Sequence, residues 1–246
     1  MKEFILGILP GAVFFYRYSP RFSVGRMVGL LLMEFAPYLL IAVINSINVK
    51  FVLFGFVLVY GIYDFGYLHN DYKAEKERSG ATIRSQFSEF NYLAFAIYRV
   101  PVVFFVFYYL ASLGGGDILK SIAITACIVP FFIIHNELRS PRARIITFIV
   151  LNGLKIVSRI ILLGPNCLYF VFSAMPHLVI KLLHYLGAKE IVLVDDKTLK
   201  SITLQIYFGF LTLLLFVDPF LVVAAVPYFL NHAKSIFRDF IKVRTL

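Results

Sequence analysis

The sequence predicts an all-α fold: one polytopic transmembrane helical bundle that occupies residues 1–246 as a single domain. Three observations predict it. Apolar residues make up 60% of the chain and the mean hydropathy is +0.84, both higher than in soluble domains. These residues fall in runs close to the length of about 20 that crosses a bilayer. Basic residues gather in every second connection between the runs.

The apolar runs predict about eight membrane-spanning helices, within a range of seven to nine. In order, they cover 27–48, 51–69, 92–113, 118–135, 144–163, 166–186, 201–217 and 219–233. Only Asp218 and Pro219 separate the last two runs. These runs therefore either form a hairpin that enters the membrane partway, or one of them is re-entrant. We expect 1–26 to be a cytoplasmic or interfacial segment, because Pro10 interrupts it and no cleavage site follows, and 234–246 to be a cytoplasmic tail.

The net charge of +10 is explained by loop position rather than by a nucleic-acid partner. The basic connections contain Lys2, Arg17, Arg21 and Arg26; Lys73, Lys76, Arg78 and Arg84; Arg139, Arg142 and Arg144; Lys181, Lys189, Lys197 and Lys200; and Lys234, Arg238, Lys242 and Arg244. The alternate connections are short and nearly uncharged. The positive-inside rule therefore predicts a multi-pass integral membrane protein with both termini in the cytoplasm.

A polar stripe follows the second predicted helix. Tyr60, Asp64, Tyr67 and Asp71 recur at helical spacing and share one face, which Glu75 and Arg78 continue. An ionisable residue inside a membrane is costly, so Asp64 suggests a functional site. The alternative is that Asp64 hydrogen-bonds a neighbouring helix while the outer acids pair with nearby bases in solvent.

The end of this stripe resembles a known motif. Asn70 and Asp71 resemble the first signature of the UbiA superfamily of intramembrane prenyltransferases, in which Asn-Asp is followed by Asp three residues on and Asp four further. The stretch 79–84 looks like the second part of that signature, with Arg84 as the matching base. The chain departs from the family where Ala74 and Arg78 replace the later acids.

The resemblance implies a reaction and an ion. In the family, the acids hold Mg²⁺ that grips a diphosphate leaving group. It thus implies Mg²⁺, with Mn²⁺ as an alternative ion, bound by Asn70, Asp71 and Glu75. Asn70 and Asp71, with Arg84 and the deeper Asp64, form the expected catalytic set. The family's second acidic motif, after the sixth helix, is matched only loosely by Asp195 and the adjacent Asp196; Asp195 is the candidate ligand, and a solvated turn is the alternative.

An internal echo adds further candidates. The triplet His69-Asn70-Asp71 is matched by His135-Asn136-Glu137, and both end a predicted helix on the cytoplasmic side. We expect Glu137 to join the metal and Asn136, Arg139 and Arg142 to contact phosphate oxygens, because metal ions and guanidinium groups bind such oxygens. Alternatively, Asn136 caps a helix end.

Charged residues inside the predicted spans need partners. The plausible ion pairs are Glu34 with Arg99 and Asp64 with Lys155, and the alternative is contact with an anionic ligand. Arg99, Lys155 and the aromatic Tyr67 are therefore counted as substrate-binding candidates.

These observations predict a Mg²⁺-dependent transferase of the UbiA type. It would move a prenyl or phosphoribosyl group from a diphosphate donor to a lipid-soluble acceptor, such as a membrane lipid or polyprenyl substrate, at the cytoplasmic face. A non-catalytic protein that binds lipid phosphate or serves as a complex subunit is the alternative, because acids are missing from both motifs. A small-solute transporter is a third reading, without the paired broken helices typical of that class.

Overall fold

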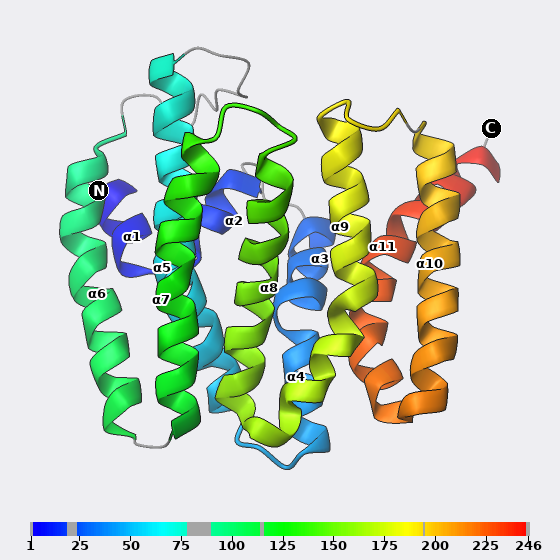
Figure 1. Cartoon of the computed structure of the whole chain (residues 1–246), viewed down its shortest axis with the longest axis horizontal. Coiled ribbons are helices and arrows are strands. Elements are labelled where there is room, and N and C mark those ends of the chain that lie inside the picture. The colour runs from blue at the N-terminus through cyan, green and yellow to red at the C-terminus, as the bar shows by residue number, and fades with distance from the viewer. Residues whose placement is uncertain (1, 19–23, 78–89, 114–115, 194, 245–246) are drawn as a thin grey trace.

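The structure is a computed structural model that describes residues 2–18, 24–77, 90–113, 116–193 and 195–244. Side chains are described for these residues except 2, 18, 24–27, 74–77, 116, 196 and 234–244. Every regular element within these ranges is helical (Figure 1). The all-α prediction is therefore confirmed for the described part of the chain.

The helices follow one another in an antiparallel bundle (Figure 1). They are α1 (Lys2–Ile8), α2 (Ala12–Tyr18), α3 (Val24–Glu34), α4 (Ala36–Ile44), α5 (Lys50–Glu77), α6 (Tyr92–Ser112), α7 (Gly116–Glu137), α8 (Arg144–Leu163), the 3₁₀ helix η2 (Pro165–Ala174), α9 (Met175–Ala188), α10 (Asp196–Val217) and α11 (Pro219–Arg244). Among the described residues, six helical stretches are long and apolar enough to cross a membrane: α5, α6, α7, α8, η2 with α9, and α10.

Two of the eight predicted spans are not single long apolar helices. The first predicted span is broken at Phe35 into α3 and α4. Pro37 lies in the first turn of α4, and because it has no N–H it cannot continue the hydrogen-bond ladder of α3. The last predicted span is the apolar first part of α11, 219–233, which is shorter than a full span.

The sixth predicted span also differs in conformation. Its first ten residues form η2, and α-helical geometry begins only at Met175. Pro176 follows immediately, and its missing N–H leaves the carbonyl of Phe172 to a tighter bond from Met175. A change of helix type at this depth is tolerated because Phe170 and Ala174 are buried in protein rather than exposed to lipid.

The N-terminal segment packs within the bundle. Helix α1 packs on α6 and α2 packs on α5, with Leu6, Val13 and Phe14 buried. The expectation that 1–26 is a cytoplasmic or interfacial segment stays a prediction. The turn between the two short helices contains Gly11 at φ +86°, a left-handed conformation that favours glycine. The chain thus enters the bundle and folds back before α3.

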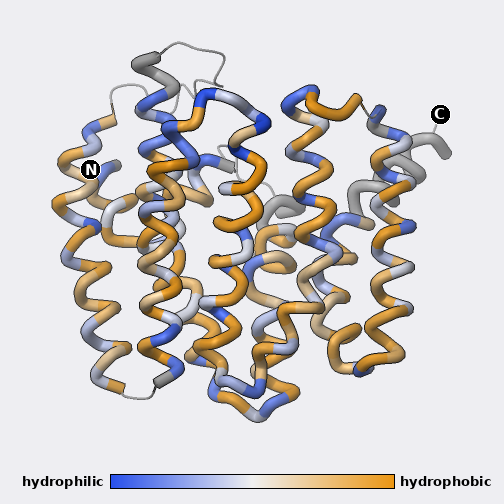
Figure 2. Tube along the Cα trace, viewed as in Figure 1, coloured by the Kyte–Doolittle hydropathy of each residue, from blue (hydrophilic) through white to orange (hydrophobic). Residues whose placement is uncertain are grey.

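The two ends of the bundle differ in charge. The connections after α7 and α9 lie at one end, and those after α4, α8 and α10 lie at the other (Figure 1). Exposed Arg139, Arg142, Lys189 and Lys197 are at the first end. The predicted clustering of basic connections is therefore confirmed for these two connections. Between the ends, the helices are mostly hydrophobic (Figure 2).

Large apolar side chains point outward from the bundle. Phe104 and Tyr108 on α6 are 70% and 76% exposed, and Phe216 on α10 is 85% exposed. Such surfaces are rare on soluble monomers and normal against lipid. Six long apolar helices with these outward faces are compatible with a multi-pass membrane protein.

Helix α8 joins the two parts of the core. Ile156 and Ile160 pack in the cluster built by α4, η2, α9, α10 and α11, whereas Leu151 packs with α2, α5 and α7. Helices α5 and α7 approach closely at Gly66, where an added Cβ would lie 2.4 Å from the ring of Phe132.

We expect Gly66→Ala to lower the free energy of unfolding by about 1–3 kcal/mol, because the methyl group forces α5 and α7 apart. The measurement is thermal or denaturant unfolding of the purified protein in detergent. Gly209→Ala on α10 is the control, since nothing lies within 4 Å of its added Cβ. Equal stability of the two variants would contradict the close approach of α5 and α7.

Candidate functional site

The polar stripe of α5 points into the bundle, as predicted. Tyr60 and Asp64 have no exposed surface, Asp71 is buried, and Tyr67 is partly buried. Because α5 is unbroken, Asp64 lies roughly 10 Å deeper than Asp71. The stripe therefore runs from the middle of the bundle to the end that carries the basic connections.

Asp64 ties three elements together. Its carboxylate accepts hydrogen bonds from the backbone N–H groups of Gly11 and Phe14 at 2.8 and 3.2 Å, and it pairs with Arg99 of α6 at 3.0 Å. All three partners are on neighbouring helices or turns. The contacts of Asp64 therefore agree with the alternative prediction, in which it hydrogen-bonds a neighbouring helix. Its predicted catalytic role has no support in this geometry.

Arg99 also makes structural contacts. Besides Asp64, its guanidinium donates to the backbone carbonyls of Leu6, Gly7, Leu9 and Tyr60, at 2.7 Å to Gly7 and 2.9 Å to Leu9. It has no exposed surface. Arg99 therefore holds the N-terminal helices in place and is not positioned to contact a substrate.

Glu34 is the second buried acid of the interior. It lies at the end of α3, where the helix breaks, and faces α8. Its carboxylate contacts the Lys155 ammonium at 2.6 Å and the Arg159 guanidinium at 3.0 Å, and Arg159 also donates to the Glu34 carbonyl. Lys155 and Arg159 reach the same acid because they are four residues apart on one face of α8.

The predicted ion pairs, Glu34 with Arg99 and Asp64 with Lys155, are both wrong. The partners are exchanged because α1 and α2 bring Asp64 and Arg99 together, whereas the break at Phe35 aims Glu34 at α8. Lys155 also donates to the Tyr60 hydroxyl at 3.0 Å, so it lies at the deep end of the stripe.

At the outer end of the stripe, Asp71 pairs with Arg17 of α2 at 3.1 Å. Arg17 also donates to the Tyr67 carbonyl at 2.9 Å, and its guanidinium lies 4.9 Å from the centre of the Tyr67 ring. The sequence pattern predicts Arg17 only as one of the basic residues that precede the first predicted span. No local signal could identify it, because its contact with Asp71 depends on the fold-back of α2.

Aromatic rings connect the two ends of the stripe. The ring centres of Tyr60 and Tyr63 are 5.9 Å apart, and those of Tyr63 and Tyr67 are 5.6 Å apart. Phe14 lies 5.0 Å from Tyr60, and Phe132 lies 4.7 Å from Tyr63. We call these five residues the aromatic column. It extends along α5 from Lys155 to the pair of Arg17 and Asp71.

The predicted metal ligands are not brought together. The carboxylate of Glu137 binds Lys73 at 2.5 Å, whereas Asp71 binds Arg17 on the opposite face of α5. The joint site of Asp71 and Glu137 is therefore not formed. The side chain of Glu75 and all of Arg84 lie outside the described residues.

Asp195 is distant from α5 and has a different role. It lies at the start of α10, on the far side of the bundle from α5 (Figure 1). It caps α10 by accepting hydrogen bonds from the Thr198 backbone at 2.9 Å and the Thr198 hydroxyl at 2.5 Å. These bonds hold the pKa of the Asp195 carboxyl below its usual range. The capping role matches the solvated-turn alternative.

Among the described residues, no three His, Cys, Asp or Glu side chains lie close enough to share a metal ion. Asn70 is partly buried beside Asp71, but the acid itself faces a guanidinium. The donor groups that the structure describes therefore do not fit the Mg²⁺ site that the resemblance implies.

The triplets 69–71 and 135–137 are in contact, but through His69 and Asn136 rather than through Asp71 and Glu137. The Asn136 amide lies 3.1 Å from His69 Nδ1 and 3.2 Å from the Gly66 carbonyl, to which it donates. The buried Asn136 Oδ1 has no hydrogen-bond partner among the described residues. Asn136 therefore links α7 to α5 instead of capping its own helix. Arg139 and Arg142 are exposed in the following connection.

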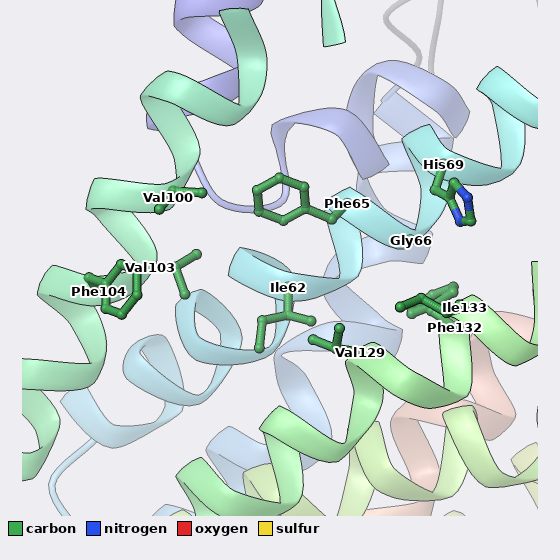
Figure 3. Close-up of a pocket in the computed structure, with 10 residues that line it drawn as sticks. All are labelled: Ile62, Phe65, Gly66, His69, Val100, Val103, Phe104, Val129, Phe132 and Ile133. Atoms are coloured by element: carbon green, nitrogen blue, oxygen red, sulfur yellow. The ribbon is translucent and has the colours of Figure 1, made fainter. Parts of the chain in front are cut away.

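An apolar groove of about 530 Å³ lies on the other face of α5 (Figure 3). Ten residues from α5, α6 and α7 line it: Ile62, Phe65, Gly66, His69, Val100, Val103, Phe104, Val129, Phe132 and Ile133. His69 lies at one end of the groove and is the one titratable residue among the described lining residues (Figure 3). The groove and the pair of Arg17 and Asp71 are thus separated by α5.

Comparisons with known proteins leave the family open. The chain matches no family model, no curated protein and no solved structure.

We expect Asp64→Asn to destabilise the protein by about 3–5 kcal/mol, because Arg99 loses the carboxylate that pairs with its buried charge at 3.0 Å. Unfolding in detergent measures the loss, and a double-mutant cycle with Arg99→Met should show that the two losses are not additive.

The matched control is Asp117→Asn, which removes a surface pair with Lys120 worth about 0–1 kcal/mol. Similar losses for Asp64→Asn and Asp117→Asn would contradict the structural role of the buried pair.

Proposed function

We propose that the protein is an intramembrane transferase of the UbiA type, which moves a prenyl group from a diphosphate donor to a lipid-soluble acceptor. One observation carries the proposal: the aromatic column along α5 ends at the buried pair of Arg17 and Asp71. The resemblance of Asn70 and Asp71 to the family's first signature supports it. A phosphoribosyl donor is the second choice, because aromatic rings stabilise an apolar prenyl chain better than a polar sugar.

The proposed chemistry follows from the two parts of the site. The bond between the first prenyl carbon and the diphosphate oxygen breaks, and the diphosphate leaves with the electron pair. Arg17 lies where it can balance the charge of the departing group, and Asp71 orients Arg17. The faces of the aromatic rings stabilise the positive charge that develops on carbon. The acceptor then forms the new bond and loses a proton.

The described residues do not assemble a Mg²⁺ site, so every role above belongs to the chain's own side chains. We also propose that the end with the basic connections faces the cytoplasm, because Arg139, Arg142, Lys189 and Lys197 lie there.

We expect purified protein to transfer radiolabelled prenyl groups from a panel of prenyl diphosphates, and Tyr67→Leu to lower the rate roughly tenfold or more, since a desolvated cation–π contact contributes about 2 kcal/mol. Tyr108→Leu, which removes a ring from the outward face of α6, is the matched control. Asp71→Asn should also lower the rate, whereas Asp195→Asn should not.

Each reaction is run with and without Mg²⁺, and phosphoribosyl diphosphate completes the panel. No turnover of any donor would refute the transferase proposal. Turnover that is unaffected by both Tyr67→Leu and Asp71→Asn would refute the assigned site.

A second function is favoured by the groove: binding of a phospholipid without catalysis. The groove lies between α5, α6 and α7, and the outward faces of α6 and α7 are largely unburied. An acyl or prenyl chain would lie along Val103 and Val129, and its headgroup would reach His69 and Lys73. This function needs no metal and no exposed catalytic acid.

We expect Val129→Trp to fill the groove and reduce the amount of lipid that co-purifies with the protein, as measured by native mass spectrometry. Val223→Trp on α11 is the control, because the two valines are similarly exposed, at 44% and 41%. If lipid binding were equal in both variants, the groove would not be the lipid site. Lipid binding without turnover would favour this second function over the first.

A further inference from the structure

A separate polar cluster lies between α8, α9 and α11. On α9, His177, Lys181 and His184 are spaced along one face at intervals of four and three residues. His177 Nδ1 lies 3.2 Å from His232 Nε2 of α11, and the Lys181 ammonium donates to Asn152 Oδ1 of α8 at 3.2 Å. None of these residues belongs to the aromatic column or to the groove.

The charges of this cluster are unbalanced within the described residues. Lys155, Arg159 and Lys181 are three cations, and Glu34 is the one carboxylate among them. Glu34 is already bound by Lys155 and Arg159. No described carboxylate lies within ion-pairing distance of Lys181, whose ammonium interacts electrostatically with both Glu34 and Lys155.

Such an excess of positive charge is costly inside a membrane protein. Lys155 and Arg159 are 5% and 2% exposed, so water screens them little. The Arg159 Nε atom is also buried without a hydrogen-bond partner among the described residues. An anion is the ligand that would balance these charges.

Lys181 is more accessible than the other two cations of the cluster. Lys181 and Asn152 are only partly buried, unlike Lys155, Arg159 and His177. Lys181 lies seven residues before the end of α9, which places it roughly 10 Å below the end of the bundle that carries the basic connections. Lys155 lies eleven residues after the start of α8 at the same end, so Lys181 is the cation that a charged group arriving from that end would reach first.

The donors indicate the class of anion. The Asn152 amide is already committed, because its Oδ1 accepts from Lys181 and its Nδ2 donates to the Phe148 carbonyl at 2.8 Å. The remaining donors are the Lys181 ammonium of α9, the pair of His177 and His232 on α9 and α11, and the Arg159 Nε of α8, so they come from three helices. A phosphate group has several strong acceptor oxygens that can receive donors arranged in this way. We propose that this cluster is a binding site for a phosphate-bearing anion, with Lys181 as its principal contact. The site does not depend on the proposed transferase activity.

The test measures ligand-induced thermal stabilisation of the full-length protein in two arms. The first arm adds inorganic pyrophosphate to the detergent-purified protein. The second compares nanodiscs of phosphatidic acid with nanodiscs of phosphatidylcholine. A response in the first arm identifies a free phosphate ligand, and a response in the second identifies a lipid headgroup; either supports the site when Lys181 is required.

We expect Lys181→Gln to weaken the response roughly tenfold or more, because it removes a charge-assisted hydrogen bond. Lys197→Gln, at the exposed start of α10, is the matched control and should leave the response unchanged. Lys181→Arg keeps the cation and should retain binding, which separates loss of the ligand from loss of the fold.

No stabilisation of the wild-type protein in either arm would overturn the proposal, and so would equal losses in Lys181→Gln and Lys197→Gln. Because binding is measured without turnover, an inactive protein that binds pyrophosphate would refute the transferase and retain this site. An active protein whose binding ignores Lys181 would do the reverse.

Discussion

The buried pair of Asp64 and Arg99 is the interaction on which the N-terminal half of the structure depends. A carboxylate in the middle of a membrane bundle must be matched by a cation and hydrogen-bond donors. Asp64 obtains them from α6 and from the turn between α1 and α2, and Arg99 binds the carbonyls at the end of α1. The pair thereby satisfies backbone groups that a fold-back inside a membrane would otherwise leave exposed.

This arrangement determines what the outer end of α5 contains. With α2 held against α5, Arg17 reaches Asp71 and Tyr67, and Phe14 joins the aromatic column. The Asp71 carboxylate, which the resemblance predicts to be a metal ligand, is therefore paired with the Arg17 guanidinium. The same contacts leave the opposite face of α5 to the groove and to the contact of His69 with Asn136. One helix thus borders two chemically different environments.

Glu34, a further buried acid, shows how a local break in a helix changes which bases an acid contacts. Because α3 ends at Glu34 and Pro37 starts a new helix, the Glu34 carboxylate turns to α8 and binds both of its interior bases. That leaves Lys181 on α9 with an amide partner and no carboxylate among the described residues. Among the described side chains on this side of the bundle, positive charge is therefore in excess, because Lys155 and Arg159 share the one carboxylate of Glu34.

The sequence by itself determined the all-helical fold with its long apolar helices, the shared end of the basic connections after α7 and α9, and the inward face of α5. These features follow from composition and periodicity, which are local properties of the chain. Only the tertiary structure decided that Glu34 binds Lys155 instead of Arg99 and that Arg17 meets Asp71. Each of these contacts depends on how helices distant in the sequence pack and where a proline interrupts them, and no spacing along the chain records that choice.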